Sequence, residues 1–326
     1  MADRSRQPEV TVVIPTRNRK QLLRLALASA LEQTGVELEV VVVDEGSRDG
    51  TAEMIRSLGD GRVRLVRHER PLGKSAARNR GIHEATAGWV AFLDDDDLWA
   101  PDKLLLQLQE LRETGRRWSY TGAVNITQTH RILGGAPPRA ADEVAESLPR
   151  VNSVPGGCSS VLVARTALPA DGFNPRYRLC EDWDLWIRLA KNGTPAAVLK
   201  PLVGYRVHGG NSSMDTDRYL VEIEMIDAAH GGPVDRITFY RHLGRVCLRM
   251  NRSGMALGHY VRAAAREPSY LLRGFPSDVL TVAASLEDRC REKLHLPRRP
   301  PRRDPFVAWK DEARAWIDNF VQRHPI

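Results

Sequence analysis

The first hundred residues of the chain alternate between short apolar runs and amphipathic segments, and this alternation limits the fold more than any other feature. The apolar runs are rich in β-branched residues and only a few residues long, as is typical of strands that are buried on both faces. They occupy residues 10–14, 38–43, 63–66 and 89–93. Strand–helix–strand repeats of this kind form a parallel sheet with helices on both faces. The sequence therefore predicts an α/β fold with a mostly parallel, doubly wound sheet.

The rest of the chain carries a different pattern. Residues 118–124 and 160–163 are expected to be further strands, and the polar stretch with glycine and proline at 134–138 is expected to be a mobile loop. Beyond these strands the pattern gives way to helical periodicity. We therefore predict one domain over residues 1–214 and a helical region over residues 215–326.

The composition excludes several classes of protein. Of the 326 residues, 42% are hydrophobic and 27% are charged, which is typical of a globular chain. No apolar run approaches the roughly 18 residues that a membrane span needs, and the start of the chain lacks the apolar core of a signal peptide, so we expect a cytoplasmic protein. The four scattered cysteines indicate neither a disulfide framework nor a zinc site. The formal net charge of +7 suits anionic ligands such as nucleotide diphosphates, with nucleic acid as the alternative explanation.

Four consecutive aspartates, Asp94 to Asp97, directly follow the apolar run at 89–93. Adjacent carboxylates repel one another, and oxygen-rich clusters of this type suit hard cations such as Mg²⁺ and Mn²⁺. A solvated acidic turn is the alternative, but such turns rarely follow a buried parallel strand so abruptly. Because ligands of open α/β sheets bind at the carboxyl ends of the strands, the run indicates a cation site at this edge of the sheet.

Two further segments bring polar groups to the same edge. Asp44 and Glu45 follow the run at 38–43 and are candidates to accept hydrogen bonds from a nucleobase or a ribose. Helix capping by the residues after them is the alternative, and both roles can coexist. Lys74 and Arg78 lie in a basic segment of small residues that either holds phosphate at a helix start or forms a solvated helix face.

The order and spacing of these motifs resemble those of the family 2 glycosyltransferases, whose fold is called GT-A. The resemblance is carried by residues 13–18, 43–47, 77–79, 94–97, 180–186 and 205–213. Each motif is weak alone, but the ordered set is specific. The resemblance implies that residues 1–214 form a nucleotide-sugar-binding catalytic domain and leaves residues 215–326 for acceptor binding, packing or dimerisation.

The resemblance implies a donor site built from the strand ends. The residues that would bind the donor are Pro15, Thr16, Arg17, Asp44, Glu45, Lys74, Arg78, Asp94 and Asp95. The first three would line the nucleobase pocket, and Glu45 occupies the acidic position that reads the base. Most relatives have Asp-Asp-Gly-Ser there, so the additional methylene of Glu45 leaves the choice of nucleotide open.

The resemblance also implies a metal site. Within the acidic run it assigns metal binding to Asp96, with Asp94 or Asp95 toward the ribose. His208 matches a position near the diphosphate or the metal, although an isolated histidine is more often a packed or surface residue. The expected cofactor is a divalent cation, Mn²⁺ or Mg²⁺.

Asp182, the second acid of Glu181-Asp182, would be the catalytic base by the same resemblance. The residues point the same way, because Asp182 falls in the first turn of a predicted helix, where the macrodipole favours the ionised carboxylate. A helix-capping acid without a catalytic part is the alternative. The residues that would surround the sugar and the acceptor are Gly157, Cys158, Ser159, Glu181 and Trp183. No QxxRW signature of processive synthases follows Asp182, which favours the addition of a single sugar.

These assignments predict an inverting, metal-dependent glycosyltransferase. It would move one sugar from a nucleotide diphosphate donor, UDP- or dTDP-linked, to a hydroxyl of a glycan, a lipid-linked intermediate or a small natural product, and no nucleic acid partner is expected. A sugar nucleotidyltransferase is the first alternative, but the chain lacks the glycine-rich loop that such an enzyme carries at its first strand. A basic protein that binds anionic ligands without catalysis is the second, and it leaves the acidic run unexplained.

The end of the chain holds two more features. A cluster of arginines is interpreted as a proline-stiffened solvated linker, with peripheral contact to the inner face of an anionic membrane as the alternative. Its residues are Arg298, Arg299, Arg302 and Arg303. An apolar stripe at helical spacing follows, and it predicts a helix that packs on the catalytic domain or on a second subunit in a homodimer. Its residues are Trp309, Ala313, Trp316, Ile317 and Phe320.

Overall fold

The computed structural model divides the chain into two compact units. It describes residues 7–135, 137–208, 215–232, 234–249, 252–267, 270, 274–276, 278–280, 282–283 and 305–325. The first unit consists of Met1–Leu148, Asn152–His208 and Phe306–Ile326, and the second of Pro149–Val151 and Gly209–Pro305. The predicted boundary after residue 214 falls at the end of a segment outside the described residues, 209–214.

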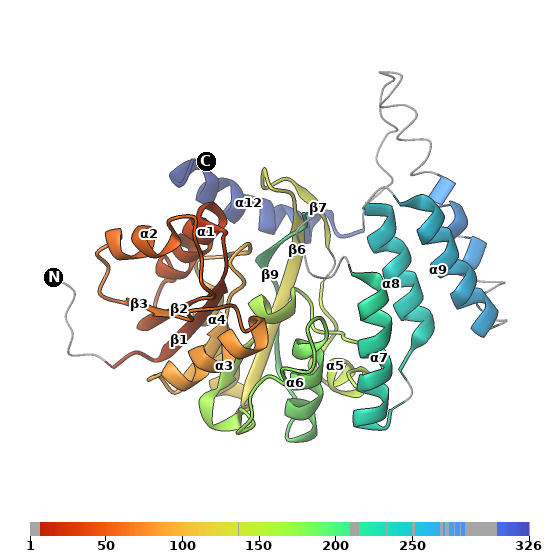
Figure 1. Cartoon of the computed structure of the whole chain (residues 1–326), viewed down its shortest axis with the longest axis horizontal. Helices are drawn as coiled ribbons and strands as arrows, with labels where there is room; N and C mark the ends of the chain where they lie inside the picture. The colour runs from red at the N-terminus through yellow and green to blue at the C-terminus, as the bar shows by residue number, and fades with distance from the viewer. Residues whose placement is uncertain are drawn as a thin grey trace, which may run out of the picture. The chain divides into compact units, whose positions relative to one another are not determined.

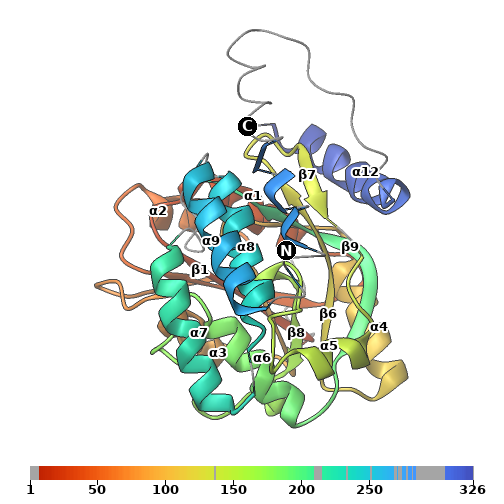
Figure 2. The same ribbon diagram turned by 90° about the vertical axis from the view of Figure 1, so that its right-hand side faces the viewer.

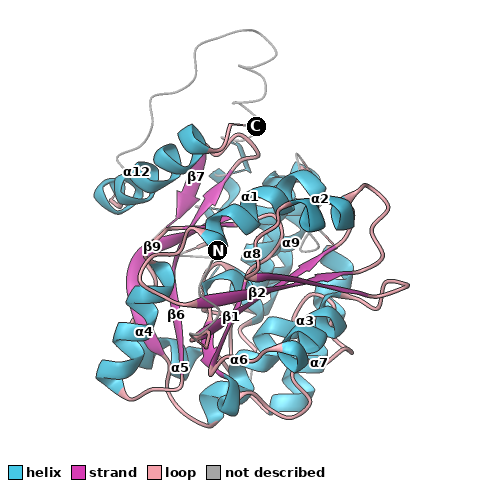
Figure 3. Cartoon of the chain, turned by 90° about the vertical axis from the view of Figure 1, so that its left-hand side faces the viewer, coloured by secondary structure: helices cyan, strands magenta, loops and turns pink. Residues whose placement is uncertain are grey.

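The first unit is built on one sheet, which Figure 3 shows in magenta. Its strands, in the described part of the chain, are β1 (Val10–Thr16), β2 (Leu38–Asp44), β3 (Val63–Arg67), β4 (Trp89–Phe92), β5 (Leu98–Trp99), β6 (Trp118–Ile126), β7 (Ile132–Gly135), β8 (Leu162–Ala164) and β9 (Ala196–Arg206). Their order is β3-β2-β1-β4-β8-β6-β9-β5, and β7 pairs with β6. The strands from β3 to β4 are parallel to their neighbours, as predicted. Beyond β4 the sheet is mixed, because β8 is antiparallel to both β4 and β6, whereas β9 is parallel to β6.

Two features of the mixed half differ from the sequence-based expectation. Residues 132–135 form a strand, so part of the loop predicted at 134–138 is paired with β6. The long strand β9 is not evident in the sequence because Lys200 and Pro201 interrupt its apolar pattern. Pro201 lies opposite Gly122, where the register shifts, and such irregular pairing is where a strand tolerates proline.

Helices cover both faces of the sheet (Figure 1). The described helices of this unit are α1 (Lys20–Leu31), α2 (Thr51–Ser57), α3 (Lys74–Glu84), α4 (Lys103–Thr114), α5 (Ala141–Ser147), α6 (Glu181–Lys191) and α12 (Val307–Arg323). Alternate residues of β2 face opposite sides: Val40 and Val42 join the cluster under α1 and α4, whereas Val41 and Val43 pack against α3. The helix α3 lies so close to β1 that a Cβ on Gly81 would stand 2.2 Å from Val13 Cγ1. This packing fixes the start of α3 near the carboxyl ends of the strands.

The last helix, α12, packs on the first unit. Ala313, Ile317 and Phe320 are buried in a cluster with Leu25 of α1 and with residues of β6. The indole nitrogens of Trp309 and Trp316 donate to backbone carbonyls of β9, and Arg323 forms an ion pair with Glu32. The prediction that this apolar stripe packs on the preceding domain is confirmed, and the helix belongs to the first unit rather than to the helical region predicted over residues 215–326. The helix is therefore part of the same compact unit as residues almost three hundred positions earlier in the chain, since His324 pairs with Glu32 across 292 positions.

The second unit is helical in its described residues. It contains α7 (Thr216–His230), α8 (Arg236–Arg249) and α9 (Ser253–Arg266), which lie side by side in Figures 1 and 2. The helices α8 and α9 bury Cys247, Ala256 and Tyr260 between them. The arginine cluster at 298–303 lies outside the described residues. In the part of the chain that is described, none of the helices has the length and apolarity that a bilayer crossing requires.

Candidate active site

The acidic run follows β4 at the carboxyl edge of the sheet, and its aspartates are compensated by different groups. Asp97 is fully buried and acts as an anchor: it accepts hydrogen bonds from Ser159 Oγ at 2.6 Å and from the backbone N–H of Arg206 at 2.8 Å. Burial raises the pKa of Asp97 well above its ordinary value, and the charges of Asp96 and Asp94 add to this. Asp97 therefore ties the run to the 3₁₀ turn at Gly157–Ser160 and to the end of β9.

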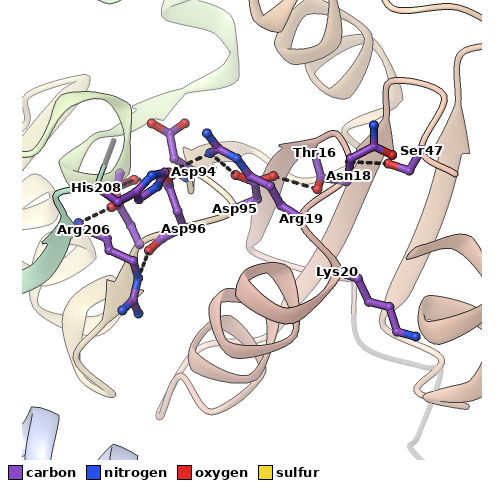
Figure 4. Close-up of polar contacts among 12 residues, drawn as sticks. Thr16, Asn18, Arg19, Lys20, Ser47, Asp94, Asp95, Asp96, Arg206 and His208 are labelled. Atoms are coloured by element: carbon purple, nitrogen blue, oxygen red, sulfur yellow. Dashed lines mark hydrogen bonds and ion pairs between the residues drawn. The ribbon is translucent and has the colours of Figure 1, made fainter. Parts of the chain in front are cut away.

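Asp95 and Asp96 face a common set of donors, shown in Figure 4. Thr16 Oγ1 donates to Asp95 at 2.7 Å. Arg19 Nη1 lies 3.0 Å from Asp95 Oδ1 and 2.7 Å from Asp96 Oδ2. The Nε2 atom of His208 lies 2.9 Å from the same Asp96 Oδ2. One guanidinium thus bridges the two carboxylates, and the imidazole contacts Asp96 alone.

The charges of this group shift one another. Burial, with the neighbouring charge of Asp96, raises the pKa of Asp95 to about 7, against the opposing effect of Arg19. Burial alone would lower the pKa of Arg19, but Asp95 and Asp96 outweigh it, so the pKa of Arg19 is raised. The guanidinium of Arg19 is therefore charged, and burial together with the repulsion between the two carboxylates accounts for the raised pKa of Asp95.

Arg78 connects the acidic run with the helix α6. Its guanidinium forms ion pairs with Asp94 and, at 2.8 Å, with Glu181 Oε1, and its side chain is almost fully buried. Lys74 Nζ lies 2.7 Å from the same Glu181 oxygen. Burial raises the pKa of Asp94, yet the charges of Arg78 and Lys74 outweigh it and the pKa is lowered. The predicted donor residues Lys74, Arg78 and Asp94 are thus brought together with Glu181.

Asp182 forms no ion pair with a described cation, although the charges of Lys74 and Arg78 lie near enough to favour its ionised form. It lies in the first turn of α6, and its Oδ1 accepts the backbone N–H of Trp183 at 2.6 Å. Its Oδ2 faces Gly157, where an added Cβ would stand 3.7 Å away. Burial, with the charge of Glu181, raises the pKa of Asp182 to about 6. A carboxylate of this kind is ionised near neutral pH and is a competent proton acceptor.

The remaining residues expected near the sugar have different surroundings. Ser159 Oγ accepts the backbone N–H of Asp94 at 3.0 Å while it donates to Asp97, so it positions the acidic run. Burial raises the pKa of the Cys158 thiol well above its ordinary value. Trp183 is turned into the core, where its indole N–H donates to Leu148 O at 2.7 Å, so its side chain is not available to an acceptor in this structure.

At the other end of the site, Pro15 is buried at the end of β1 and Arg17 is exposed beyond it. Asp44 is fully buried at the end of β2 and accepts the backbone N–H of Ser47 at 2.8 Å. Its second oxygen, Oδ2, receives no hydrogen bond from the described residues. This oxygen is suited to a donor from a ligand, such as a nucleobase N–H.

Glu45 has a different environment from the one expected for a residue that reads the base. Its Oε1 pairs with His68 Nδ1, and its Oε2 accepts the backbone N–H groups of Leu72, at 2.8 Å, and Gly73. Both oxygens therefore hold the loop between β3 and α3. In this structure Asp44 Oδ2, rather than Glu45, is the acceptor without a hydrogen bond at this end of the site, and its only compensation from the described residues is the charge of Arg67, whose Nε lies 3.6 Å away.

Sequence reasoning missed Arg19 and Arg206. Arg19 is two positions beyond the predicted nucleobase segment, and Arg206 is buried with its Nε donating to Asp96 O at 2.7 Å. The available signal was the charge of the run: Asp95, Asp96 and Asp97 are buried and need compensation, and the sequence places Arg19 just after one matched motif and Arg206 within another.

The donor set of Asp96 and His208 fits a divalent cation that is shared with a ligand. Within the described ranges, no group of three or more His, Cys, Asp or Glu side chains is arranged to hold a metal alone. Cations of the Mg²⁺ type are usually held by one or two carboxylates together with substrate phosphates, and imidazole suits the transition metals. A carboxylate and an imidazole 2.9 Å apart therefore fit a cation whose remaining ligands come from a diphosphate.

Comparison with known proteins gives consistent matches. The family model described as glycosyl transferase family 2 matches residues 11–132. The amylovoran biosynthesis glycosyltransferase AmsB of Erwinia amylovora is 33% identical, and the match covers 60% of this chain and 69% of that protein. WfgD of Escherichia coli, a UDP-Glc:α-D-GlcNAc-diphosphoundecaprenol β-1,3-glucosyltransferase, is 26% identical over 64% of this chain and 81% of its own. An uncharacterized glycosyltransferase of Rickettsia felis is 31% identical over 65% of this chain, which spans only 35% of that longer protein.

Two solved structures are similar in fold. S. aureus TarS 1-349 in complex with UDP-GlcNAc matches with a TM-score of 0.54 and 16% identity, over 97% of this chain and 91% of that one. The mannosyltransferase PcManGT from Pyrobaculum calidifontis, in complex with GDP-Man and Mn²⁺, matches with a TM-score of 0.53 and 20% identity, over 98% of this chain and 87% of that one. At these identities the likeness concerns the fold, and it confirms the predicted GT-A class.

Proposed function

The chain belongs to glycosyltransferase family 2, and on that premise we propose that it transfers one sugar from a nucleotide diphosphate donor to an acceptor hydroxyl, with inversion at the anomeric carbon. The donor would lie along the carboxyl edge of the sheet, between Asp44 and the acidic run. Asp182 would be the catalytic base, and Asp96 with His208 would hold a divalent cation.

One observation carries this proposal: the buried guanidinium of Arg78 pairs with Asp94 and with Glu181, the residue before Asp182. A single side chain thus links the acidic run to the helix that presents Asp182. Two functions that the reaction needs, binding of the leaving diphosphate and deprotonation of the acceptor, are therefore held in one rigid, buried unit. Such fixed positioning is a major source of catalytic power.

The proposed reaction is a direct displacement. The acceptor oxygen attacks the anomeric carbon as its proton passes to the Asp182 carboxylate, and the bond between that carbon and the diphosphate oxygen breaks on the opposite face. Asp182 is suited to this role because it forms no ion pair with a described cation and because its pKa of about 6 leaves it ionised at neutral pH. A bound divalent cation would neutralise the charge that develops on the diphosphate.

The small residues opposite Asp182 support an acceptor that approaches from this side. Gly157 starts the 3₁₀ turn and has a φ of +55°, a conformation that favours glycine. Its missing side chain leaves space beside Asp182 Oδ2. The residues beneath this surface, Cys158 and Ser159, are buried, so the backbone of the turn rather than its side chains would meet the sugar.

The relatives direct the first choice of substrates. WfgD is named for a UDP-glucose donor and for an acceptor sugar on diphosphoundecaprenol, and AmsB for amylovoran biosynthesis. We infer a UDP-linked donor and an acceptor hydroxyl on a lipid-linked saccharide, which would bring the protein to a membrane surface.

The proposal is tested by ligand-dependent stability and by the product. The purified chain is heated with UDP, dTDP or GDP, each with and without Mn²⁺, as wild type and as Asp96→Asn. A ligand present at 100 times its dissociation constant should stabilise the folded state by about 2.7 kcal/mol. We expect a Mn²⁺-dependent stabilisation for UDP that is lost in Asp96→Asn.

Incubation with UDP-sugars and a lipid-linked saccharide should then release UDP. Release of pyrophosphate from a sugar phosphate and a nucleoside triphosphate would instead identify a nucleotidyltransferase. Absence of stabilisation by every nucleotide would contradict the donor site and would favour a protein that binds anionic ligands without catalysis.

A further inference from the structure

Arg19 occupies the position where a cation would be expected between Asp95 and Asp96. One nitrogen, Nη1, lies 3.0 Å from Asp95 Oδ1 and 2.7 Å from Asp96 Oδ2, so a single positive group bridges the two carboxylates. The carboxylate side chains are 7% and 9% exposed, whereas Arg19 is 31% exposed. Figure 4 shows the guanidinium lying against both of them. The buried carboxylates of Asp95 and Asp96 are thus compensated by the positive charge of Arg19, which is the more accessible side chain.

The same oxygen, Asp96 Oδ2, is also the atom that His208 Nε2 approaches at 2.9 Å. A divalent cation held by Asp96 and His208 would bind at this oxygen, at about 2.0 to 2.2 Å. It would then stand a few ångströms from the guanidinium nitrogen, in a setting where like charges at such distances repel strongly. Arg19 and a divalent cation therefore cannot both hold Asp96 Oδ2.

We propose that Arg19 is the internal counter-ion of the donor-free site and that the divalent cation displaces it when the donor binds. This inference rests on the proposed function, because it takes Asp96 and His208 as the cation ligands. In the donor-free enzyme Arg19 neutralises the carboxylate pair and competes with the metal. The diphosphate of the donor supplies the additional negative charge that favours the exchange.

The surroundings of Arg19 allow this movement. The residue is the N-cap of α1, so its side chain is at the end of the helix and not packed within it. An open hollow lies beside it, lined by Asn18, Arg19, Lys20, Gln21, Leu22 and Asp49. The guanidinium can turn into this hollow without displacing a core residue. This exchange of Arg19 for the metal makes the affinity for the metal depend on the presence of the nucleotide.

The test measures metal binding directly on the full chain, without an assay of transfer. Free Mn²⁺ is followed by electron paramagnetic resonance during titration with MnCl₂, first alone and then with UDP. Arg19→Gln should bind Mn²⁺ at least about tenfold more tightly than wild type in the absence of nucleotide, because a repelling charge is removed and two carboxylates lose their partner. Arg19→Lys, which keeps the charge, should show a smaller gain.

The matched control is Arg24→Gln on the same helix, which removes the same charge from an exposed side chain one turn away. Its affinity for Mn²⁺ should stay within about twofold of wild type, since exposed charges are screened. Mn²⁺ should also raise the melting temperature of Arg19→Gln by more than that of Arg24→Gln, and this comparison serves if Arg19→Gln folds poorly without metal.

The outcomes separate the two proposals. Equal Mn²⁺ affinity of wild type and Arg19→Gln, with binding abolished in Asp96→Asn, would overturn the counter-ion role and leave the metal site intact. Absence of Mn²⁺ binding by every variant, even with UDP, would overturn the metal site of the proposed function and this inference with it. Tighter binding by Arg19→Gln, to a lesser extent by Arg19→Lys and not by Arg24→Gln, with a smaller benefit from UDP in Arg19→Gln than in wild type, is the result we expect.

Discussion

The acidic run and Asp182 lie in the same unit, yet their charges are compensated in different ways. Every carboxylate of the run has a partner: Asp94 pairs with Arg78, Asp95 and Asp96 with Arg19, and Asp97 with Ser159 and the backbone of Arg206. From the described residues, Asp182 receives only the N–H of the residue that follows it. Both regions are acidic and both lie near the carboxyl edge of the sheet, so residue type and position do not distinguish them.

The difference shows how the surroundings in one fold suit different aspartates to different functions. Within the run, Asp94 pairs with Arg78, whose charge, together with that of Lys74, holds the pKa of Asp94 low and suits this carboxylate to binding as an anion. A carboxylate without such a partner, in the first turn of a helix and beside a negative neighbour, has a pKa near the pH at which it works.

The pKa values of Asp95 and Asp97 are raised as well, but their oxygens are occupied by neighbouring groups, whereas Asp182 Oδ2 faces the space beside Gly157. This accessible oxygen, rather than the pKa alone, suits Asp182 to proton transfer.

The strongest test of this contrast is Asp182→Asn. An amide cannot accept the proton of the acceptor, so the rate of transfer should fall by about 10²- to 10⁴-fold while the dissociation constant for UDP stays close to that of wild type. Rate is measured by UDP release and affinity by calorimetry.

The matched control is Asp184→Asn, two positions further along α6, where the carboxylate pairs with Arg188 at 2.8 Å. This variant should lose some stability and keep its catalytic rate. Similar rates for Asp182→Asn and wild type would remove Asp182 from the reaction and make it a structural residue like those of the run.

The second test concerns the acidic run, whose carboxylates have partners. Arg78→Gln leaves two carboxylates without their buried partner, and loss of one member of a buried ion pair typically costs about 3–5 kcal/mol of unfolding free energy. Urea denaturation followed by tryptophan fluorescence measures it. Arg80→Gln on the same helix, whose ion pair with Glu84 is half exposed, should change the stability by no more than about 0.5 kcal/mol. Equal effects of the two substitutions would contradict the structural role of Arg78.

The third test uses pH. The pKa of Asp182 is raised to about 6, first by burial and then by Glu181, so the carboxylate is protonated below that pH and cannot act as a base. The rate of transfer should therefore fall as the pH is lowered through 6, by about tenfold per pH unit. In Glu181→Gln, which removes the negative neighbour, the fall should occur at lower pH. If the acidic limb of the pH–rate profile stays at the same pH in this variant, that limb belongs to another titrating group.

The sequence by itself determined the elements and the edge at which the site forms. The β-branched runs specify the parallel strands β1 to β4 because buried strands need apolar side chains on both faces. The polar residues that follow these runs lie at one edge of the sheet because parallel strands all end there. The position of Asp182 in the first turn of α6 and the apolar stripe of α12 also follow from local spacing. These features depend on neighbours a few positions apart, which a pattern records.

Only the tertiary structure decided which charge compensates which. Arg78 and Glu181 are separated by 103 positions, and His208 and Asp96 by 112, so no local pattern can pair them. The same holds for Glu45, whose oxygens are taken by the loop before α3, and for Arg19, which meets Asp95 only because β1 and β4 are adjacent in the sheet. The order of the strands brings these groups together, and that order depends on how the whole sheet packs. The sequence thus determines which residues are carboxylates, and the fold determines which partner each carboxylate has and therefore what chemistry it can do.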